Sequence, residues 1–207
     1  MKALIVVDVQ NDFCPGGALA VPDGDRIIPV INRISPRFPV VVLTQDWHPE
    51  GHVSFATSHQ GAEPGQTVTL EDGTDQMLWP DHCVRGTKGA ELHQRLETNT
   101  ASLILRKGMN VSLDSYSAFM ENDRSTRTGL EGYLRERNVD QVYVAGLALD
   151  YCVLFTATDC SRLGFDTVLV RDATRGVGIP EGSVERALEK MKEASVRMVD
   201  SGEIAAE

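Results

Sequence analysis

Six short apolar runs recur along the chain, and they constrain its fold more than any other feature of the sequence. They are rich in Val, Ile and Leu, and they are apolar at nearly every position rather than at every second one. Strands of this kind are buried on both faces, which is typical of parallel strands lying between layers of helices. The predicted strands are Ala3–Val7, Val40–Thr44, Ser102–Leu105, Gln141–Ala145, Thr167–Val170 and Val196–Val199.

Stretches with helical periodicity or helix start signals lie between these runs. We find no internal repeat or linker that would divide the chain. The alternation predicts a single doubly wound α/β domain over residues 1–207, with about six mostly parallel strands and helices on both faces of the sheet. The predicted helices are Asp25–Ile34, Ala90–Glu97, Thr126–Arg137, Cys152–Leu163 and Pro180–Ala194.

The charge of the chain limits its partners. Twenty Lys and Arg residues face thirty Asp and Glu residues, so the formal net charge is −10. Proteins that bind nucleic acid gain most of their affinity from cationic side chains on phosphates. We therefore expect no nucleic acid partner, and a small molecule as the ligand.

The amino-terminal apolar run could be taken for a signal peptide because Lys2 precedes it. Asp8 interrupts that run, no small-residue cleavage site follows, and no stretch approaches the roughly 18 apolar residues of a membrane span. We therefore expect a cytoplasmic protein with no membrane partner. Four widely spaced cysteines without a CxxC pair favour reduced thiols, as is usual in that compartment.

Three polar side chains stand at or near the ends of predicted strands: Asp8, Asp46 and Lys107. Doubly wound sheets bind ligands at the carboxyl ends of their strands, so these side chains could converge on one crevice. The segment Trp47–Thr100 is rich in Gly, Pro and His and has little periodic pattern. Loops of that length in compact domains are usually functional.

A candidate metal site begins with Asp46 and His48, which point to the same side of an extended chain. His82, from a folded-back loop, could complete a set that leaves coordination positions open. Such ligands suit Zn²⁺, Fe²⁺ or Mn²⁺, and the sequence does not choose among them. His52 could be a fourth ligand or lie behind the ligands and hold one of them in place. The alternative is that these loop histidines face solvent or bind the backbone.

Cys152 lies where a predicted strand breaks and a helix begins. A thiol at a helix amino terminus has a lowered pKa and lies near free N–H groups that could form an oxyanion hole. Asp8, desolvated at a strand end, could act as its base, and Lys107 could favour the thiolate and the oxyanion. The alternatives are a core cysteine, a capping Asp8 and a surface Lys107.

Taken together and in order, several motifs resemble the nicotinamidase branch of the isochorismatase-like cysteine hydrolases. The resemblance extends over nearly the whole chain. Its motifs are ValValAspValGlnAsnAspPhe, GlnAspTrpHisProGluGlyHisValSerPhe, LeuTrpProAspHisCysValArgGlyThr, ArgLysGly, AspSerTyrSerAlaPhe and AlaGlyLeuAlaLeuAspTyrCysVal.

The resemblance implies a role for each matching residue. It implies a catalytic triad, a single divalent cation that meets the pyridine nitrogen of the substrate, and a pocket for the pyridine ring. Zn²⁺ is the expected ion, with Fe²⁺ or Mn²⁺ as alternatives. The implied triad is Asp8, Lys107 and Cys152, the metal ligands are Asp46, His48 and His82, and the ring pocket is lined by Phe13, Leu19, Trp79 and Tyr116.

The resemblance also implies an oxyanion hole formed by the backbone N–H groups of Ala148 and Cys152. It implies a cis peptide bond between Leu147 and Ala148. Members of the family often carry Thr where this chain has Leu149, so a hydroxyl beside the nucleophile is missing here.

The activity implied is hydrolysis of nicotinamide to nicotinate and ammonia through a cysteine thioester, in NAD salvage, with pyrazinamide as a further substrate. The sequence leaves open whether the protein forms a homo-oligomer. The alternatives are a related enzyme acting on a carbamoyl or vinyl-ether substrate, a metal or thiol-binding module without turnover, and attack by metal-bound water with an inert Cys152.

Overall fold

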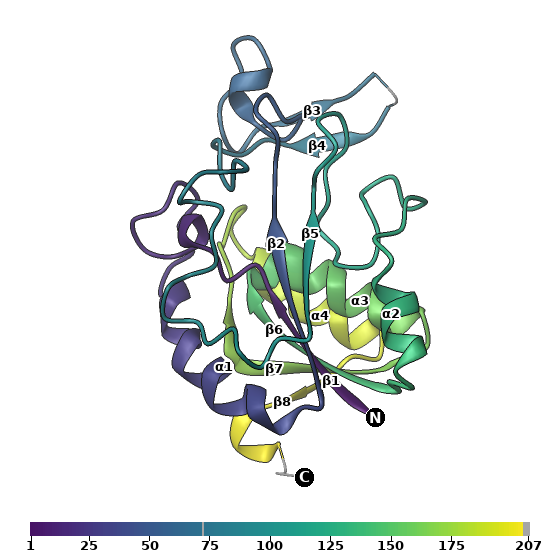
Figure 1. Ribbon diagram of the computed structural model, residues 1–207. Helices are drawn as coiled ribbons and strands as arrows, with labels where there is room; N and C mark the ends of the chain where they lie inside the picture. The colour runs from purple at the N-terminus through teal and green to yellow at the C-terminus, as the bar shows by residue number, and fades with distance from the viewer. Residues whose placement is uncertain (72, 205–207) are drawn as a thin grey trace.

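The computed structural model describes residues 1–71 and 73–204. Its centre is a sheet of six strands in the order β5-β2-β1-β6-β7-β8, as Figure 1 shows. Every neighbouring pair in this sheet is parallel, which confirms the predicted doubly wound α/β fold. Its strands are β1 (Lys2–Val7), β2 (Val40–Asp46), β5 (Leu103–Lys107), β6 (Gln141–Leu147), β7 (Asp166–Arg175) and β8 (Arg197–Val199).

Helices cover both faces of the sheet because side chains along each strand point alternately to opposite sides. In β1, Leu4 and Val6 belong to the hydrophobic cluster that contains helix α1 (Ile28–Ile34). Ala3, Ile5 and Val7 belong to the cluster on the other face, which is covered by three helices (Figure 1). These are α2 (Leu130–Glu136), α3 (Leu154–Arg162) and α4 (Ser183–Glu193).

The predicted helix Ala90–Glu97 is wrong. Its backbone pairs with the loop that follows β1: Leu92 forms an antiparallel bridge with Gln10, and the His93 N–H donates to the Val9 carbonyl at 2.9 Å. Each such bond uses a backbone group that a helix would need for itself. Tertiary pairing has therefore overridden a weak local helical preference.

The other helices are present, but several begin at different residues. Gly129 and Gly182 have φ angles of 92° and 75°, and these left-handed positions directly precede α2 and α4 and set their starts later than predicted. The stretch predicted to start at Asp25 is divided into the 3₁₀ turn Gly24–Ile27 and α1. Helix α3 is preceded by a π-helical turn, Leu149–Val153, so the helical path begins before Cys152.

The long segment between β2 and β5 contains one element that the sequence did not predict. Strands β3 (Thr67–Thr69) and β4 (Asp75–Met77) form an antiparallel hairpin. In Figure 1 the hairpin stands beyond the ends of β2 and β5, at the edge where the candidate site lies. Single 3₁₀ turns occupy Asn11–Phe13, Ser35–Arg37, Ala56–Ser58 and Ser201–Glu203.

None of the helices described is long and apolar enough to cross a lipid bilayer. All four cysteines, Cys14, Cys83, Cys152 and Cys160, are buried and free, as predicted for reduced thiols.

Candidate active site

The polar side chains singled out in the sequence meet in one crevice at the carboxyl ends of the strands. Asp8 follows β1, Asp46 ends β2, Lys107 ends β5, and Cys152 lies in the turn after β6. Strand β2 lies on one side of β1 and β6 lies on the other, so the order of the strands reverses direction at β1. The crevice therefore lies at a topological switch point. This is where open parallel sheets bind ligands.

Lys107 is the centre of this cluster and is wholly buried. Its Nζ lies 2.9 Å from Asp8 Oδ2 and 3.4 Å from Cys152 Sγ, and it forms an ion pair with Asp46. Burial alone would lower the pKa of this amine, but the carboxylates of Asp46 and Asp8 raise it well above its usual value. Lys107 is thus a fixed positive charge inside the protein, and the alternative of a surface charge is excluded.

The two carboxylate oxygens of Asp8 have different partners. Its Oδ1 accepts a hydrogen bond of 2.6 Å from the Thr44 hydroxyl. Its Oδ2 forms an ion pair with Lys107 Nζ at 2.9 Å. Burial raises the pKa of Asp8 despite the opposing charge of Lys107, as predicted for a strand-end carboxylate. A carboxylate with a raised pKa beside a thiol is suited to accept a proton.

The Cys152 thiol differs from its prediction in one respect. Burial raises its pKa well above the usual value, and the charge of Lys107 opposes that effect only in part. The expected lowering of the pKa by a helix terminus is therefore wrong, because burial in the crevice and the carboxylates of Asp46 and Asp8 raise the pKa of Cys152. A thiol that stays protonated needs a base nearby, and ligand atoms of Asp8 and Cys152 lie within 4.8 Å of each other.

The turn between β6 and Cys152 has the unusual backbone that the resemblance implied. Gly146 has a φ angle of 115°, and a Cβ there would overlap the backbone of Val7. The Leu147–Ala148 peptide bond is cis. Ala148 and Cys152 both line the pocket, whereas Leu149 belongs to the core cluster under the sheet. Leu149, where the resemblance implies a hydroxyl in other members, does not line the pocket.

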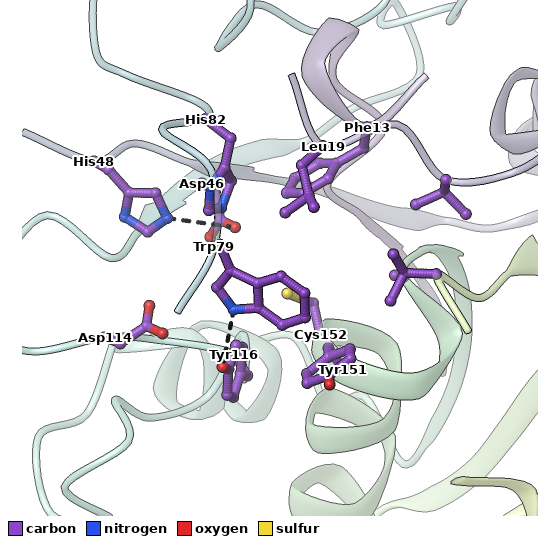
Figure 2. Close-up of a pocket in the computed structure, with 13 residues that line it drawn as sticks. Phe13, Leu19, Asp46, His48, Trp79, His82, Asp114, Tyr116, Tyr151 and Cys152 are labelled. Atoms are coloured by element: carbon purple, nitrogen blue, oxygen red, sulfur yellow. Dashed lines mark hydrogen bonds and ion pairs between the residues drawn. The ribbon is translucent and has the colours of Figure 1, made fainter. Parts of the chain in front are cut away.

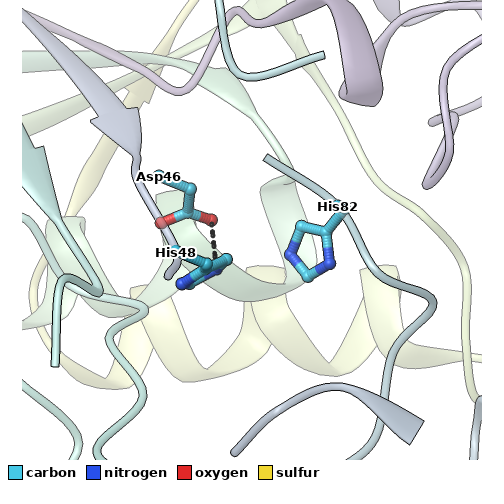
Figure 3. Close-up of side chains that lie close together, drawn as sticks. All are labelled: Asp46, His48 and His82. Carbon is cyan, nitrogen blue, oxygen red and sulfur yellow. Dashed lines mark ion pairs between the residues drawn. The ribbon is translucent and has the colours of Figure 1, made fainter. Parts of the chain in front are cut away.

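Asp46, His48 and His82 converge, as Figure 3 shows. Their candidate ligand atoms all lie within 4.8 Å of one another, and His48 Nε2 is 3.7 Å from Asp46 Oδ2. Nδ1 of His48 lies 2.9 Å from the Gly108 carbonyl, and Nδ1 of His82 lies 2.7 Å from the Pro80 carbonyl. A carbonyl only accepts, so each Nδ1 carries the proton and each Nε2 keeps a free lone pair.

The charge state of these residues also fits a divalent cation. Burial lowers the pKa of both His48 and His82, so both imidazoles are neutral, the form that binds a metal. When ionised, the buried carboxylates of Asp8, Asp46 and Asp114 exceed the single charge of Lys107 by two. The donor set and the excess negative charge both match one divalent ion with oxygen and nitrogen ligands.

His52 lies beside this group, with its ring stacked on that of His48 at 4.0 Å between centroids. Its Nδ1 accepts from the Ser54 N–H, and its Nε2 is 3.3 Å from the Leu113 carbonyl. Both ring nitrogens are therefore already engaged with protein atoms. This arrangement favours a position for His52 behind the ligands over direct ligation.

Asp114 is a pocket residue that sequence reasoning missed. It is buried, it accepts hydrogen bonds from Gln76 Nε2 and the Ser115 N–H, and it forms a second metal-like group with His48 and His52. The signal was present, because Asp114 begins the motif AspSerTyrSerAlaPhe that indicated Tyr116.

The pocket beside Cys152 is lined mainly by apolar and aromatic side chains (Figure 2). Phe13, Leu19, Trp79 and Tyr116 all lie there, as the resemblance implied, and the Trp79 Nε1–H donates to the Tyr116 hydroxyl at 3.2 Å. Pockets of this kind hold flat organic ligands through shape and apolar contact. The full lining is Phe13, Leu19, Val21, Asp46, His48, Trp79, His82, Asp114, Tyr116, Ala148, Tyr151, Cys152 and Val177.

Val21, Tyr151 and Val177 were missed for different reasons. Tyr151 directly precedes the candidate nucleophile, so its position was a usable signal. Val177 was hidden because the predicted strand stopped at Val170, whereas β7 continues to Arg175 and brings the next loop to the site edge. Val21 has no sequence signal that we recognise.

Fold and crevice together define a parallel α/β protein with a preformed pocket for a small molecule. The model of the isochorismatase domain matches residues 2–203, and the chain therefore belongs to the isochorismatase family. A nicotinamidase of Acinetobacter baylyi is 50% identical over 202 residues, which cover 98% of this chain and 94% of that protein. The resemblance stated from the motifs is confirmed.

Solved structures agree. A nicotinamidase/pyrazinamidase from Acinetobacter baumannii superposes with a TM-score of 0.95 at 51% identity, covering 99% of this chain and 98% of that one. The yeast nicotinamidase bound to the inhibitor nicotinaldehyde gives 0.90 at 35% identity, covering 97% and 100%. A pyrazinamidase of Pyrococcus horikoshii in complex with zinc gives 0.77 at 40% identity, covering 96% and 98%.

Proposed function

We propose that this protein is a nicotinamidase, which hydrolyses nicotinamide to nicotinate and ammonia as a step of NAD salvage and also deamidates pyrazinamide. The observation that carries the proposal is the buried cluster in which Lys107 Nζ lies 2.9 Å from Asp8 Oδ2 and 3.4 Å from Cys152 Sγ beside an aromatic pocket. Relatives at 50% and 46% identity that bear this name support the choice of substrate.

The first half of the reaction forms a thioester. Asp8 Oδ2 takes the proton of Cys152 Sγ, and the thiolate attacks the carboxamide carbon of the substrate. The backbone N–H groups of Ala148 and Cys152 stabilise the oxyanion, a contribution of about 3–4 kcal/mol for a well-placed donor. Asp8 then protonates the departing ammonia.

The second half hydrolyses the thioester. Asp8, again ionised, takes a proton from a water molecule, which attacks the acyl carbon. Collapse of the intermediate expels the Cys152 thiolate, which recovers its proton from Asp8. The product leaves as nicotinic acid, which passes its proton to ammonia or water to give nicotinate. Lys107 keeps its positive charge throughout and stabilises each anionic species that forms next to it.

Asp46, His48 and His82 would hold one divalent cation, with His52 behind His48. When bound, the cation supplies a Lewis-acidic position that accepts the pyridine nitrogen and so orients the ring. The zinc of the Pyrococcus horikoshii pyrazinamidase supports Zn²⁺ as the ion, with Fe²⁺ or Mn²⁺ as alternatives. This role favours hydrolysis of the amide over hydrolysis of a vinyl ether, because a vinyl-ether substrate has no ring nitrogen for the cation to hold.

The test is ammonia release by the metal-loaded enzyme from nicotinamide, pyrazinamide and benzamide. We expect turnover of the first two and poor turnover of benzamide, which has the same carboxamide without a ring nitrogen. Failure to release ammonia from nicotinamide would reject the proposed activity. Equal rates with benzamide would reject the role of the ring nitrogen.

The Cys152→Ala variant tests the nucleophile. We expect it to lose hydrolysis while it still binds nicotinamide, because the ring pocket and the metal ligands remain. Cys160→Ala is the matched control, since Cys160 is a wholly buried thiol on α3 in the core. Retention of more than a few per cent of activity in Cys152→Ala would instead favour attack by water with an inert thiol.

A further inference from the structure

We propose that Thr44 is a positioning residue for the reaction, because its hydroxyl fixes Asp8 so that Oδ2 alone is presented to the thiol. The inference rests on the proposed function, in which Asp8 transfers the proton. Thr44 does not touch the substrate pocket, and it acts only through Asp8.

The two residues are joined by a pair of hydrogen bonds. The Thr44 hydroxyl donates to Asp8 Oδ1 at 2.6 Å, and its oxygen accepts from the Asp8 N–H at 3.1 Å. Both residues are wholly buried, so water does not compete for these bonds. The neighbouring parallel strands β1 and β2 set this geometry, since their register pairs Val6 with Leu43 just before it.

Asp8 needs such a constraint because of its backbone. Its φ angle of 45° lies in the left-handed region, which is unfavourable for residues other than glycine. The bond from the Asp8 N–H to the Thr44 oxygen holds the backbone there, and the bond to Oδ1 fixes the rotation of the carboxylate. One hydroxyl therefore sets both the position and the orientation of the side chain.

The remaining oxygen is the one that the reaction uses. Asp8 Oδ2 is buried and paired with Lys107 Nζ at 2.9 Å, and ligand atoms of Asp8 and Cys152 lie within 4.8 Å of each other, so the oxygen that Thr44 does not hold is the one available to the thiol. Without the Thr44 hydroxyl, the carboxylate can rotate toward Lys107 with either oxygen. The distance to the sulfur would then vary, and proton transfer depends steeply on that distance.

Three variants test the proposal with the metal-loaded enzyme. Thr44→Val keeps the shape but removes the hydroxyl, and we expect kcat to fall by about 10- to 100-fold, with KM changed by less than about threefold. Thr44→Ser keeps the hydroxyl and should restore kcat to within about threefold of wild type. Thr167→Val removes a buried hydroxyl of β7 that donates to the Phe165 carbonyl and does not line the pocket, so it should leave kcat unchanged.

A second measurement does not need turnover and reports on the thiol itself. The alkylation rate of Cys152 by iodoacetamide, followed by peptide mass spectrometry, should fall in Thr44→Val, because the Asp8 carboxylate stays in the site but is less well placed to take the thiol proton. Thr44→Val should have no further effect in the Asp8→Asn background, because Thr44 acts through Asp8. The alkylation rates can be measured whether or not nicotinamide is the substrate. Failure of the proposed function and failure of this inference are therefore distinguishable.

Several outcomes would overturn the inference. One is a Thr44→Val enzyme with wild-type kcat, or one in which only KM and stability change. Another is a Thr44→Ser enzyme as slow as Thr44→Val. The last is additive effects of Thr44→Val and Asp8→Asn on the alkylation rate. Thermal melts of all variants separate loss of folding from loss of rate. If Thr44→Val does not fold, the Thr44→Ser and Asp8→Asn pair carries the same test, and a slow but stable Thr44→Ser would overturn it.

Discussion

Lys107 is a buried amine between two buried carboxylates, and this makes it important for stability as well as for rate. We expect Lys107→Ala to lower the free energy of unfolding by about 3–5 kcal/mol, because removal of one partner leaves buried charges without compensation. Urea denaturation measures this loss, and ammonia release should fall in parallel. Lys192→Ala, at an exposed position of α4, is the control. A Lys107→Ala enzyme with wild-type stability would show that the carboxylates are already neutral.

Gly108 is required by the position of the His48 ring. Its φ angle is +63°, and a Cβ there would overlap the imidazole. We expect Gly108→Ala to displace His48 and weaken metal binding by about 10- to 100-fold, the usual cost of disturbing the residues that orient a ligand. Competition with a chelator measures the affinity.

A matched control for Gly108 separates backbone strain from the clash. Gly61 has a similar φ angle of +75°, but a Cβ at that position meets nothing within 4 Å. Gly61→Ala should therefore cost some stability without any change in metal affinity. Equal loss of affinity in both variants would contradict the role of Gly108.

At the scale of elements, the loop after β7 is held against the pocket by Asp150. Its carboxylate accepts hydrogen bonds from the N–H groups of Val177 and Gly178 at 2.9 Å each, and from the Ser183 hydroxyl at 2.6 Å. Val177 lines the pocket, so this carboxylate fixes one of its walls. We expect Asp150→Ala to raise KM for nicotinamide several-fold while Cys152 remains open to alkylation.

Asp172 provides the control for that element. Its carboxylate accepts hydrogen bonds from the N–H and hydroxyl of Ser201 in a similar way, but Ser201 does not line the pocket. Asp172→Ala should lower stability without raising KM. If both variants raise KM equally, the cause is general loosening of the fold and not the loop after β7.

The elements also show how far the sequence could be interpreted. The six buried strands were predictable because short, continuous apolar runs that alternate with helical stretches are typical of parallel strands buried on both faces. The stretch Ala90–Glu97 was not, because its hydrogen bonds go to Val9, Gln10 and Asn11, which no local pattern can indicate. Helix starts at Gly129 and Gly182 depend on backbone angles that the surrounding fold imposes.

The candidate site was predictable in its composition but not in its electrostatics. Strand ends and motifs identified Asp8, Asp46, Lys107 and Cys152, because parallel strands must bring their carboxyl ends together. The raised pKa of Cys152 was missed because it depends on how completely the crevice excludes water. Asp114 begins a motif that the sequence analysis used, but its hydrogen bond from Gln76 could not be predicted, because Gln76 lies in a hairpin that the sequence did not predict.

At the scale of the whole molecule, metal removal should affect activity before it affects folding. The sheet has a hydrophobic cluster on each face, and neither cluster includes the metal group. We expect chelation to abolish turnover while Tm falls only modestly, by the linkage between folding and the bound ion. Activity assays and thermal melts on the same samples, with metal restored as the control, measure both. Global unfolding on chelation would show that the cation is structural.

The strand order also has a consequence for how the chain folds. Strand β1 precedes the other five strands of the sheet in the chain and lies in the middle of the sheet, yet one of its two neighbours, β6, begins only at Gln141. One side of β1 therefore has no strand to pair with until β6 has been made. Such long sequence separations slow folding and leave an apolar edge open meanwhile. Nascent chains that end before β6 should therefore be the form of this protein that is most prone to aggregate and most dependent on chaperones.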